Sequence, residues 1–221
     1  MIDRRRGLIG TPQGRLPSWL QEVDAVTFIR GGNVSGSRVN TELKITSETI
    51  KIEMNAAMVA GGGRILYSNA KTRDTAEQSG IARYGAYQIV GNIFTSNNLT
   101  STSAMKNYVW VTSGHILTMN RNNTEWSGSL QYEGSIITDD PLCIGAETIS
   151  YPTYKHTNEG PYGELFLWQD GVLSLHFIPC RRVVDNQGGF YDLCGNICSL
   201  TGTPFFISDD SRYPILPGND I

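Results

Sequence analysis

The residues that could serve catalysis are scattered along this chain of 221 residues. Three histidines, His115, His156 and His176, could act as general bases, because imidazole titrates near neutral pH. No Gly-x-Ser-x-Gly sequence accompanies them, the motif that presents a nucleophilic serine on a sharp turn. His176 falls on the polar side of an alternating segment, which predicts a surface or edge histidine. The sequence therefore offers no serine, histidine and acid set for acyl transfer.

The cysteines and one pair of aspartates are the candidates for binding a metal ion. Cys194 and Cys198 lack the two-residue spacing of a zinc pair, and no histidine lies at ligand spacing beside them. We interpret them as reduced, partly buried thiols. Asp139 and Asp140 offer the carboxylates that Ca²⁺ prefers, but a lone Asp pair is more typical of a turn. We therefore expect no metal site and no cofactor.

Aromatic residues beside amide side chains form two candidate carbohydrate-binding loops. Proteins hold sugars with an aromatic platform and with hydrogen bonds from polar side chains. The residues concerned are Asn122, Asn123 and Trp126 in the first loop and Tyr151, Tyr154 and Asn158 in the second. The same residues could instead pack within their loops or contact another subunit, so both interpretations stay open.

Residues 1–20 are expected to form an irregular N-terminal arm. The segment contains several Gly and Pro residues and shows neither helical nor strand periodicity. Such an arm cannot bury its own apolar side chains, so these side chains need another surface. The residues expected to dock on a partner protein are Arg4, Arg5, Arg6, Leu8, Ile9 and Trp19. A frayed terminus without a partner is the alternative.

The composition indicates a globular protein rich in turns. Hydrophobic residues make up 39% and charged residues 18%, with 24 Gly and 9 Pro, which fits many short strands. The net charge of -3 provides no field that would attract nucleic acid or an anionic membrane. No run of about 20 apolar residues predicts a membrane span. The apolar run after residues 4–6 is also too short for a signal peptide, so we expect synthesis in the cytoplasm.

Short strands separated by turns recur along residues 21–208. Residues 49–54 alternate apolar and polar side chains, which is the period of a half-buried strand. Residues 172–177 alternate in the same way after Asp170-Gly171, a pair that favours a type I′ hairpin. Helix signals are scarce. The chain is therefore predicted to be an all-β sandwich over residues 21–208, followed by a C-terminal tail at 209–221.

Three details of the chain are predicted from its turn residues. We expect Pro179 to end the strand that precedes it, because proline cannot donate a ladder hydrogen bond. A second hairpin is expected to pair residues 190–193 with residues 197–200 across Gly195-Asn196. The polar segment 95–106 is expected to be a loop.

Two segments resemble the concanavalin A-like, laminin-G-like jelly-roll family. Residues 16–54 resemble the first strands of these domains, with Leu-Pro, a strand, a Gly/Ser turn and an alternating strand. Near the end, Asp170-Gly171, Phe177-Ile178-Pro179-Cys180 and Gly189-Phe190-Tyr191-Asp192 resemble the final hairpins. The resemblance implies a concanavalin A-like jelly roll from roughly residue 16 to residue 206.

Domains of this family are frequent in structural and tail-associated proteins of gut bacteriophages and in surface proteins of their hosts. The resemblance implies a non-enzymatic virion protein (a fibre, decoration or tail-associated protein) whose arm docks on the particle. The lectin-like sandwich would face outward for host attachment. Expected partners are other virion proteins, copies of the chain itself and a host surface glycan, with no nucleic acid. The alternative is a carbohydrate-binding module of a bacterial or viral surface protein, located on the bacterial cell surface.

Glycoside hydrolases occur on the same fold and are a further alternative. A retaining glycosidase needs two carboxyl groups about 5–5.5 Å apart. In the family these come from one strand as Glu-x-Asp-x-x-Glu, so that they share a face. The nearest fragment here contains Glu22 and Asp24, but Thr27 stands where the second Glu belongs. We therefore expect no enzyme activity.

Overall fold

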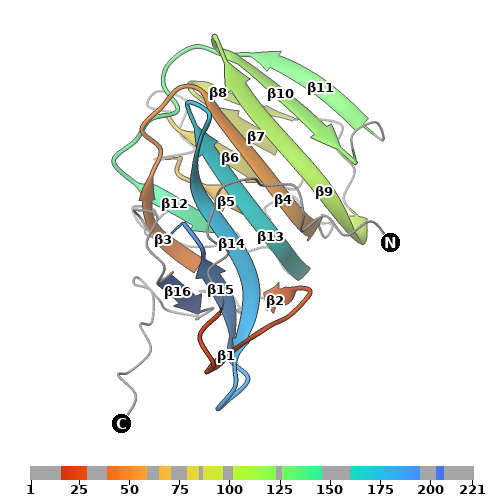
Figure 1. The fold of residues 1–221 in the computed structure, drawn as a ribbon. Helices are drawn as coiled ribbons and strands as arrows, with labels where there is room; N and C mark the ends of the chain where they lie inside the picture. Colours follow the sequence, from red (N-terminus) through yellow and green to blue (C-terminus); the bar gives the residue numbers. More distant parts are fainter. Residues whose placement is uncertain are drawn as a thin grey trace, which may run out of the picture.

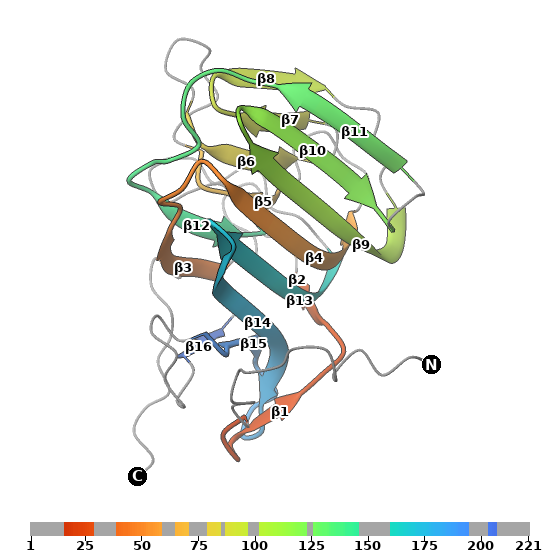
Figure 2. The same cartoon turned by 45° about the horizontal axis from the view of Figure 1, so that its top comes forward.

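The computed structural model describes residues 16–28, 39–58, 65–70, 79–84, 87–96, 102–122, 126–145, 160–194 and 203–206. Within these ranges the chain forms sixteen strands and no helix. The strands make two antiparallel sheets, one of ten strands and one of six, that lie face to face (Figure 1, Figure 2). The predicted all-β class is confirmed, and the two layers are consistent with a β-sandwich.

The large sheet contains both ends of the described chain. Its strands are β1 (Leu20–Glu22), β2 (Val26–Phe28), β4 (Ile50–Met58), β9 (Thr102–Ser113), β10 (Ile116–Arg121), β11 (Trp126–Gln131), β13 (Gly160–Gln169), β14 (Val172–Arg182), β15 (Gly188–Asp192) and β16 (Thr203–Phe206). The order across the sheet is β11-β10-β9-β4-β13-β14-β15-β16, with β1 paired to β14 and β2 paired to β13.

The small sheet is built mainly from the middle of the chain. Its strands are β3 (Val39–Lys44), β5 (Ile65–Ser68), β6 (Ile81–Tyr84), β7 (Tyr87–Val90), β8 (Ile93–Ser96) and β12 (Pro141–Ile144). The order is β3-β12-β5-β6-β7-β8, so β12 lies between two strands that precede it in the sequence. Figure 1 shows this sheet behind the large one.

The main hydrophobic core lies between the two sheets. On β4, Ile50, Ile52 and Met54 are buried and alternate with half-buried polar residues, as the sequence predicts. Trp110 of β9 is among the largest fully buried side chains, and its ring meets Tyr67 of β5 edge-on at 5.0 Å between centroids. Apolar side chains of the two sheets therefore meet in one core.

The hairpin between β13 and β14 forms as predicted. Asp170 and Gly171 both have positive φ, 49° and 78°, as a type I′ turn requires. The Asp170 carboxylate also accepts a hydrogen bond of 2.7 Å from the Ser47 hydroxyl, which fixes the turn against the segment before β4.

Pro179 does not end its strand, contrary to the prediction. It lies inside β14, which continues to Arg182. The Pro179 carbonyl accepts a hydrogen bond from the Val23 amide. Because the nitrogen and the carbonyl of one residue face the same side of a β-strand, the Pro179 nitrogen, which carries no hydrogen, faces this side as well. On that side the pairing with β13 ends at Phe177 and the pairing with β1 begins at Cys180. The missing donor therefore falls at the seam between two partner strands, where no ladder hydrogen bond is lost.

Two further predictions need correction. β15 pairs with β16 (Thr203–Phe206), whereas residues 197–200, the predicted partner, lie outside the described residues. The predicted loop at 95–106 contains the end of β8 and the start of β9. Thr102 is the Cα partner of Met58, so the tertiary pairing with β4 extends β9 into this polar segment.

Candidate functional site: the outer face of the large sheet

Half-buried or exposed polar and aromatic side chains gather on the face of the large sheet that points away from the core. Because successive side chains of a strand alternate between faces, they occupy the positions between the buried ones. Figure 1 views the sheet with the small sheet behind it, so this face is toward the reader. We call it the outer-face cluster, and its members are Lys51, Glu53, Asn55, Asn107, Glu164, Phe166, Trp168 and His176.

Three rings of the cluster contact one another across β13 and β14. Phe166 and Trp168 lie two residues apart on β13, with ring centroids 5.5 Å apart and planes at 18°. His176 is the Cα partner of Phe166, and its ring stacks on Phe166 at 4.2 Å. His176 therefore lies on the outer face, as its place in the alternating sequence predicts.

Charged groups border these rings. Lys51 is the Cα partner of Trp168, and its ammonium lies 4.7 Å from the Trp168 ring centroid, within the range of a cation–π contact. The same ammonium forms an ion pair with the Glu53 carboxylate. On the other side of the rings, the Glu164 carboxylate lies 3.7 Å from His176 Nε2. Aromatic rings and carboxylate oxygens therefore lie side by side on the outer face.

The backbone under His176 is fixed by a carboxylate. Asp192, at the end of β15, accepts hydrogen bonds from the amides of His176 at 3.0 Å and Cys194 at 2.9 Å. Its side chain is buried, with 4% exposed. Asp192 therefore positions the strand that carries His176 and is not itself presented on the outer face.

An amide row continues the cluster toward β9 and β10. Asn55 Nδ2 donates to Asn107 Oδ1 at 2.7 Å. Asn122, just after β10, accepts from the Asn107 amide through Oδ1 at 3.0 Å and donates to the Asn107 carbonyl at 2.8 Å. The predicted carbohydrate-binding residue Asn122 is therefore joined to Asn107, and through Asn107 to Asn55, two cluster residues that the sequence did not single out.

Only some of the predicted site residues fall in the described part of the chain. Trp126 is the first residue of β11 and the Cα partner of Arg121, the residue directly before Asn122. Asn123, Tyr151, Tyr154 and Asn158 lie outside the described residues. Their predicted role in carbohydrate binding stays a prediction.

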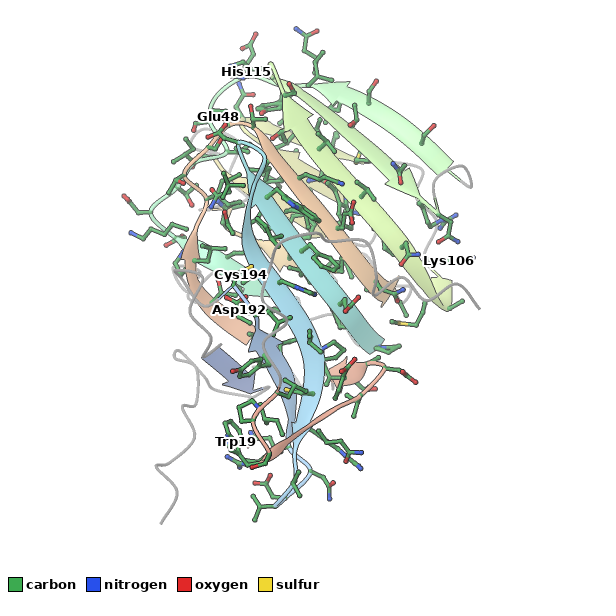
Figure 3. All side chains as sticks on the ribbon, viewed as in Figure 1. Trp19, Glu48, Lys106, His115, Asp192 and Cys194 are labelled. Carbon is green, nitrogen blue, oxygen red and sulfur yellow. The ribbon has the colours of Figure 1, made fainter. Side chains whose placement is uncertain are left out.

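The predicted arm also lies only partly within the described residues. Residues 1–15, which include Arg4, Arg5, Arg6, Leu8 and Ile9, lie outside the described residues. Trp19 packs, partly buried, against a cluster of Leu20, Cys180 and Tyr191, and its carbonyl accepts a hydrogen bond from the Val183 amide. Figure 3 shows Trp19 at the lower end of the large sheet and His115 at the upper end.

A second polar cluster lies inside the sandwich. Arg83 of β6 is fully buried beside the rings of Tyr67 and Tyr108. Burial lowers the pKa of the Arg83 guanidinium to about 10, and the neighbouring tyrosines oppose the shift. Burial likewise raises the pKa of Tyr67. These groups lie between the sheets, so we assign them to the core.

Sequence reasoning missed most of the outer-face cluster because residues 165–168 are apolar without interruption and show no alternation with polar residues. The signal was present: Phe166 and Trp168 alternate with Leu165 and Leu167, which are buried on the inner face. A strand that is apolar on both faces of a half-exposed sheet marks an unusual outer surface.

The described residues contain no group of three or more His, Cys, Asp or Glu side chains that could hold a metal ion. In the same part of the chain, no helix is long and apolar enough to cross a membrane. No protein-family model matches the sequence, and a search of curated proteins finds no match either.

Proposed function

We propose that this chain is a non-enzymatic adhesion protein of a bacteriophage virion, with a concanavalin A-like jelly roll that binds carbohydrate through the outer-face cluster. The resemblance of residues 16–54 and 163–206 to this family supports the virion context. The observation that carries the binding function is the cluster itself, where rings, carboxylates and amides meet on one sheet face.

The chemistry of the cluster suits a hydroxyl-rich ligand. Asn55 and Glu53 provide amide and carboxylate groups that can hydrogen-bond to sugar hydroxyls. Trp168 and Phe166 provide aromatic carbon for the apolar C–H surface of a sugar ring. All four residues come from β4 and β13, two strands that are paired in the centre of the sheet, so the site has a rigid base.

A glycan array on the full chain tests the binding function. Native protein should bind at least one glycan, and Trp168→Ala should weaken that binding at least about tenfold, because truncating a central aromatic hot spot costs about 2 kcal/mol or more. Val184→Ala is the matched control, since Val184 is 84% exposed in the turn after β14. Native protein that binds no glycan at high concentration would remove the carbohydrate function.

Deleting residues 1–15 tests the virion function separately. Leu16 and Trp19 pack against the cluster of Leu20, Cys180 and Tyr191, and this deletion leaves both residues in place, so we expect the truncated protein to fold. We expect it to retain glycan binding and to be absent from assembled particles. Truncated protein that is incorporated as well as the full chain would contradict docking by the arm.

A glycoside hydrolase is the second candidate, and one observation favours it. Glu53 on β4 and Glu164 on β13 lie on the same face of neighbouring strands, with Phe166 as the Cα partner of Glu53. Two carboxylates on one face are the minimum that glycosidase chemistry requires. Product release from a polysaccharide panel that is lost in both Glu53→Gln and Glu164→Gln would establish it. Absence of any product from the native protein would retire it.

A further inference from the structure

Among the described residues, the two sheets end in four edge strands, and three of them carry a feature that disfavours further pairing. An open edge presents unpaired N–H and C=O groups, so natural proteins protect it with charges, proline, irregular pairing or short length. In the large sheet β16 has four residues and contains Pro204. In the small sheet β8 has four residues, and β3 carries the exposed Lys44 and pairs irregularly with β12. The added strands β1 and β2 have three residues each.

The fourth edge, β11, has none of these features. Its six residues pair with β10 without a register shift, from Trp126 to Gln131. The sequence Trp-Ser-Gly-Ser-Leu-Gln contains neither a charge nor proline. Ser127 and Ser129 are exposed. Within the described residues, no hydrogen bond joins this strand to anything other than β10.

We propose that β11 pairs antiparallel with β11 of a second copy of this chain, centred on Gly128. In that register Ser127 of each copy faces Ser129 of the other, so no like charges meet and small side chains let the backbones approach. An antiparallel pair within one sheet has its two-fold axis perpendicular to the sheet. The two ten-stranded sheets therefore become continuous, and both outer faces point to the same side.

This geometry has a consequence for binding that rests on the proposed function. Two outer-face clusters on the same side of a dimer can engage one glycan-coated surface together, which raises the overall avidity without a new contact. The pairing of β11 does not itself depend on carbohydrate binding. A monomeric protein that binds glycans, or a dimer that binds none, separates the two ideas.

Sedimentation velocity on the full chain tests the pairing. A six-residue edge forms a small interface, so we expect a reversible dimer with a dissociation constant in the micromolar range. The variant Ser127→Lys/Ser129→Lys places lysines opposite each other at both symmetric positions, which should weaken the dimer at least about tenfold. Ser113→Lys is the control, since it adds an exposed lysine at the end of β9, two strands from the edge. It should leave the dimer unchanged.

Charge complementation makes the test specific for this edge. The variant Ser127→Glu/Ser129→Glu should also be mainly monomeric, and mixing it with the lysine variant should restore dimers. Native protein that stays monomeric throughout the micromolar range overturns the proposal. A lysine variant that dimerises as tightly as native protein, or a mixture that stays monomeric, overturns it equally.

Discussion

The two faces of the large sheet are built from the same strands and differ in what they contact. On β4, Ile52 points into the core and is fully buried, whereas Lys51 and Glu53 on either side of it are half-buried on the outer face. On β13, Leu167 is fully buried between Phe166 and Trp168. The inner face is covered by the small sheet. Neighbouring residues on one strand therefore have different roles: one side chain stabilises the core, and the next belongs to the proposed binding surface.

The aromatic residues show the same difference. On the inner side, Trp110 contacts Tyr67 of the other sheet and stacks on Tyr108 of its own strand at 5.5 Å. On the outer side, Trp168 stacks on Phe166 and is contacted by Lys51. An inner ring therefore joins two layers, while an outer ring contacts side chains of a single layer. Substitutions of matched residues should separate the two roles.

The largest expected effect comes from the two tryptophans. Trp110→Ala removes a fully buried ring and should lower the free energy of unfolding by about 3–5 kcal/mol. Trp168→Ala should lower it by no more than about 1 kcal/mol, because its ring is only half-buried, yet it should weaken glycan binding. Urea denaturation of both variants measures the difference. Equal losses of stability would show that the outer ring belongs to the core.

Two glycines in turns extend the comparison, because one is covered by a neighbouring segment and the other has open space around it. Gly91 and Gly114 both have positive φ, 53° and 56°. A Cβ on Gly91 would overlap the Glu133 carbonyl oxygen, whereas a Cβ on Gly114 would meet nothing within 4 Å. Gly114→Ala should cost roughly 1–2 kcal/mol from backbone strain, and Gly91→Ala roughly 2–5 kcal/mol because overlap is added. Thermal or urea unfolding of the pair tests this order, and a reversed order would contradict it.

The buried Cys180 thiol should make the free energy of unfolding decrease at alkaline pH. Burial raises the pKa of its thiol to about 12, so the folded protein keeps a proton that the unfolded chain loses above about pH 9. The stabilisation is complete below pH 9 and is lost as the pH rises toward 12, at up to about 1.4 kcal/mol per pH unit. Between pH 9 and 11, the free energy of unfolding of Cys180→Ala should fall less steeply with pH than that of native protein, by up to about 1.4 kcal/mol per pH unit. Parallel profiles for native protein and variant would show that the thiol is accessible.

The smallest effect is expected at the exposed turn after β14. Hydrogen bonds from Arg182 and from the Gln187 amide lower the pKa of the Asp185 carboxyl to about 2. Because the folded state lowers the pKa of this carboxyl, its ionisation stabilises the folded protein at pH values above the ordinary carboxyl pKa. This stabilisation is lost as the pH falls from about 4 toward 2. NMR titration should show the Asp185 pKa returning toward about 4 in Arg182→Ala. A pKa that stays low would assign the shift to the backbone alone.

The parts of the fold that the sequence predicted are those set by local pattern. The alternation in residues 49–54 and the Asp170-Gly171 turn act over a few residues, and both were predicted. Pro179 was predicted wrongly because its tolerance depends on Val23, far away in the sequence. The start of β9 was missed for the same reason, since its pairing with β4 outweighs the polar composition.

The candidate site shows the same limit. Asn122 was singled out from its neighbours in the sequence, but the residues that join it to the outer face are Asn107 and Asn55, brought together by strand pairing. Glu53 meets Phe166 as a Cα partner although more than a hundred residues separate them. Each residue type was visible, but the order of strands across the sheet was not, and that order creates the cluster.

The binding role of the outer face is tested most directly by mapping backbone amide NMR shifts of the full chain during titration with the best glycan from the array. We expect the largest shifts at residues 51–55, 107–109, 164–168 and 176, saturating with a single affinity. The buried strand β12 should stay unchanged. Saturable binding whose shifts are confined to the small sheet, with the outer face unaffected, would contradict the assignment of the site.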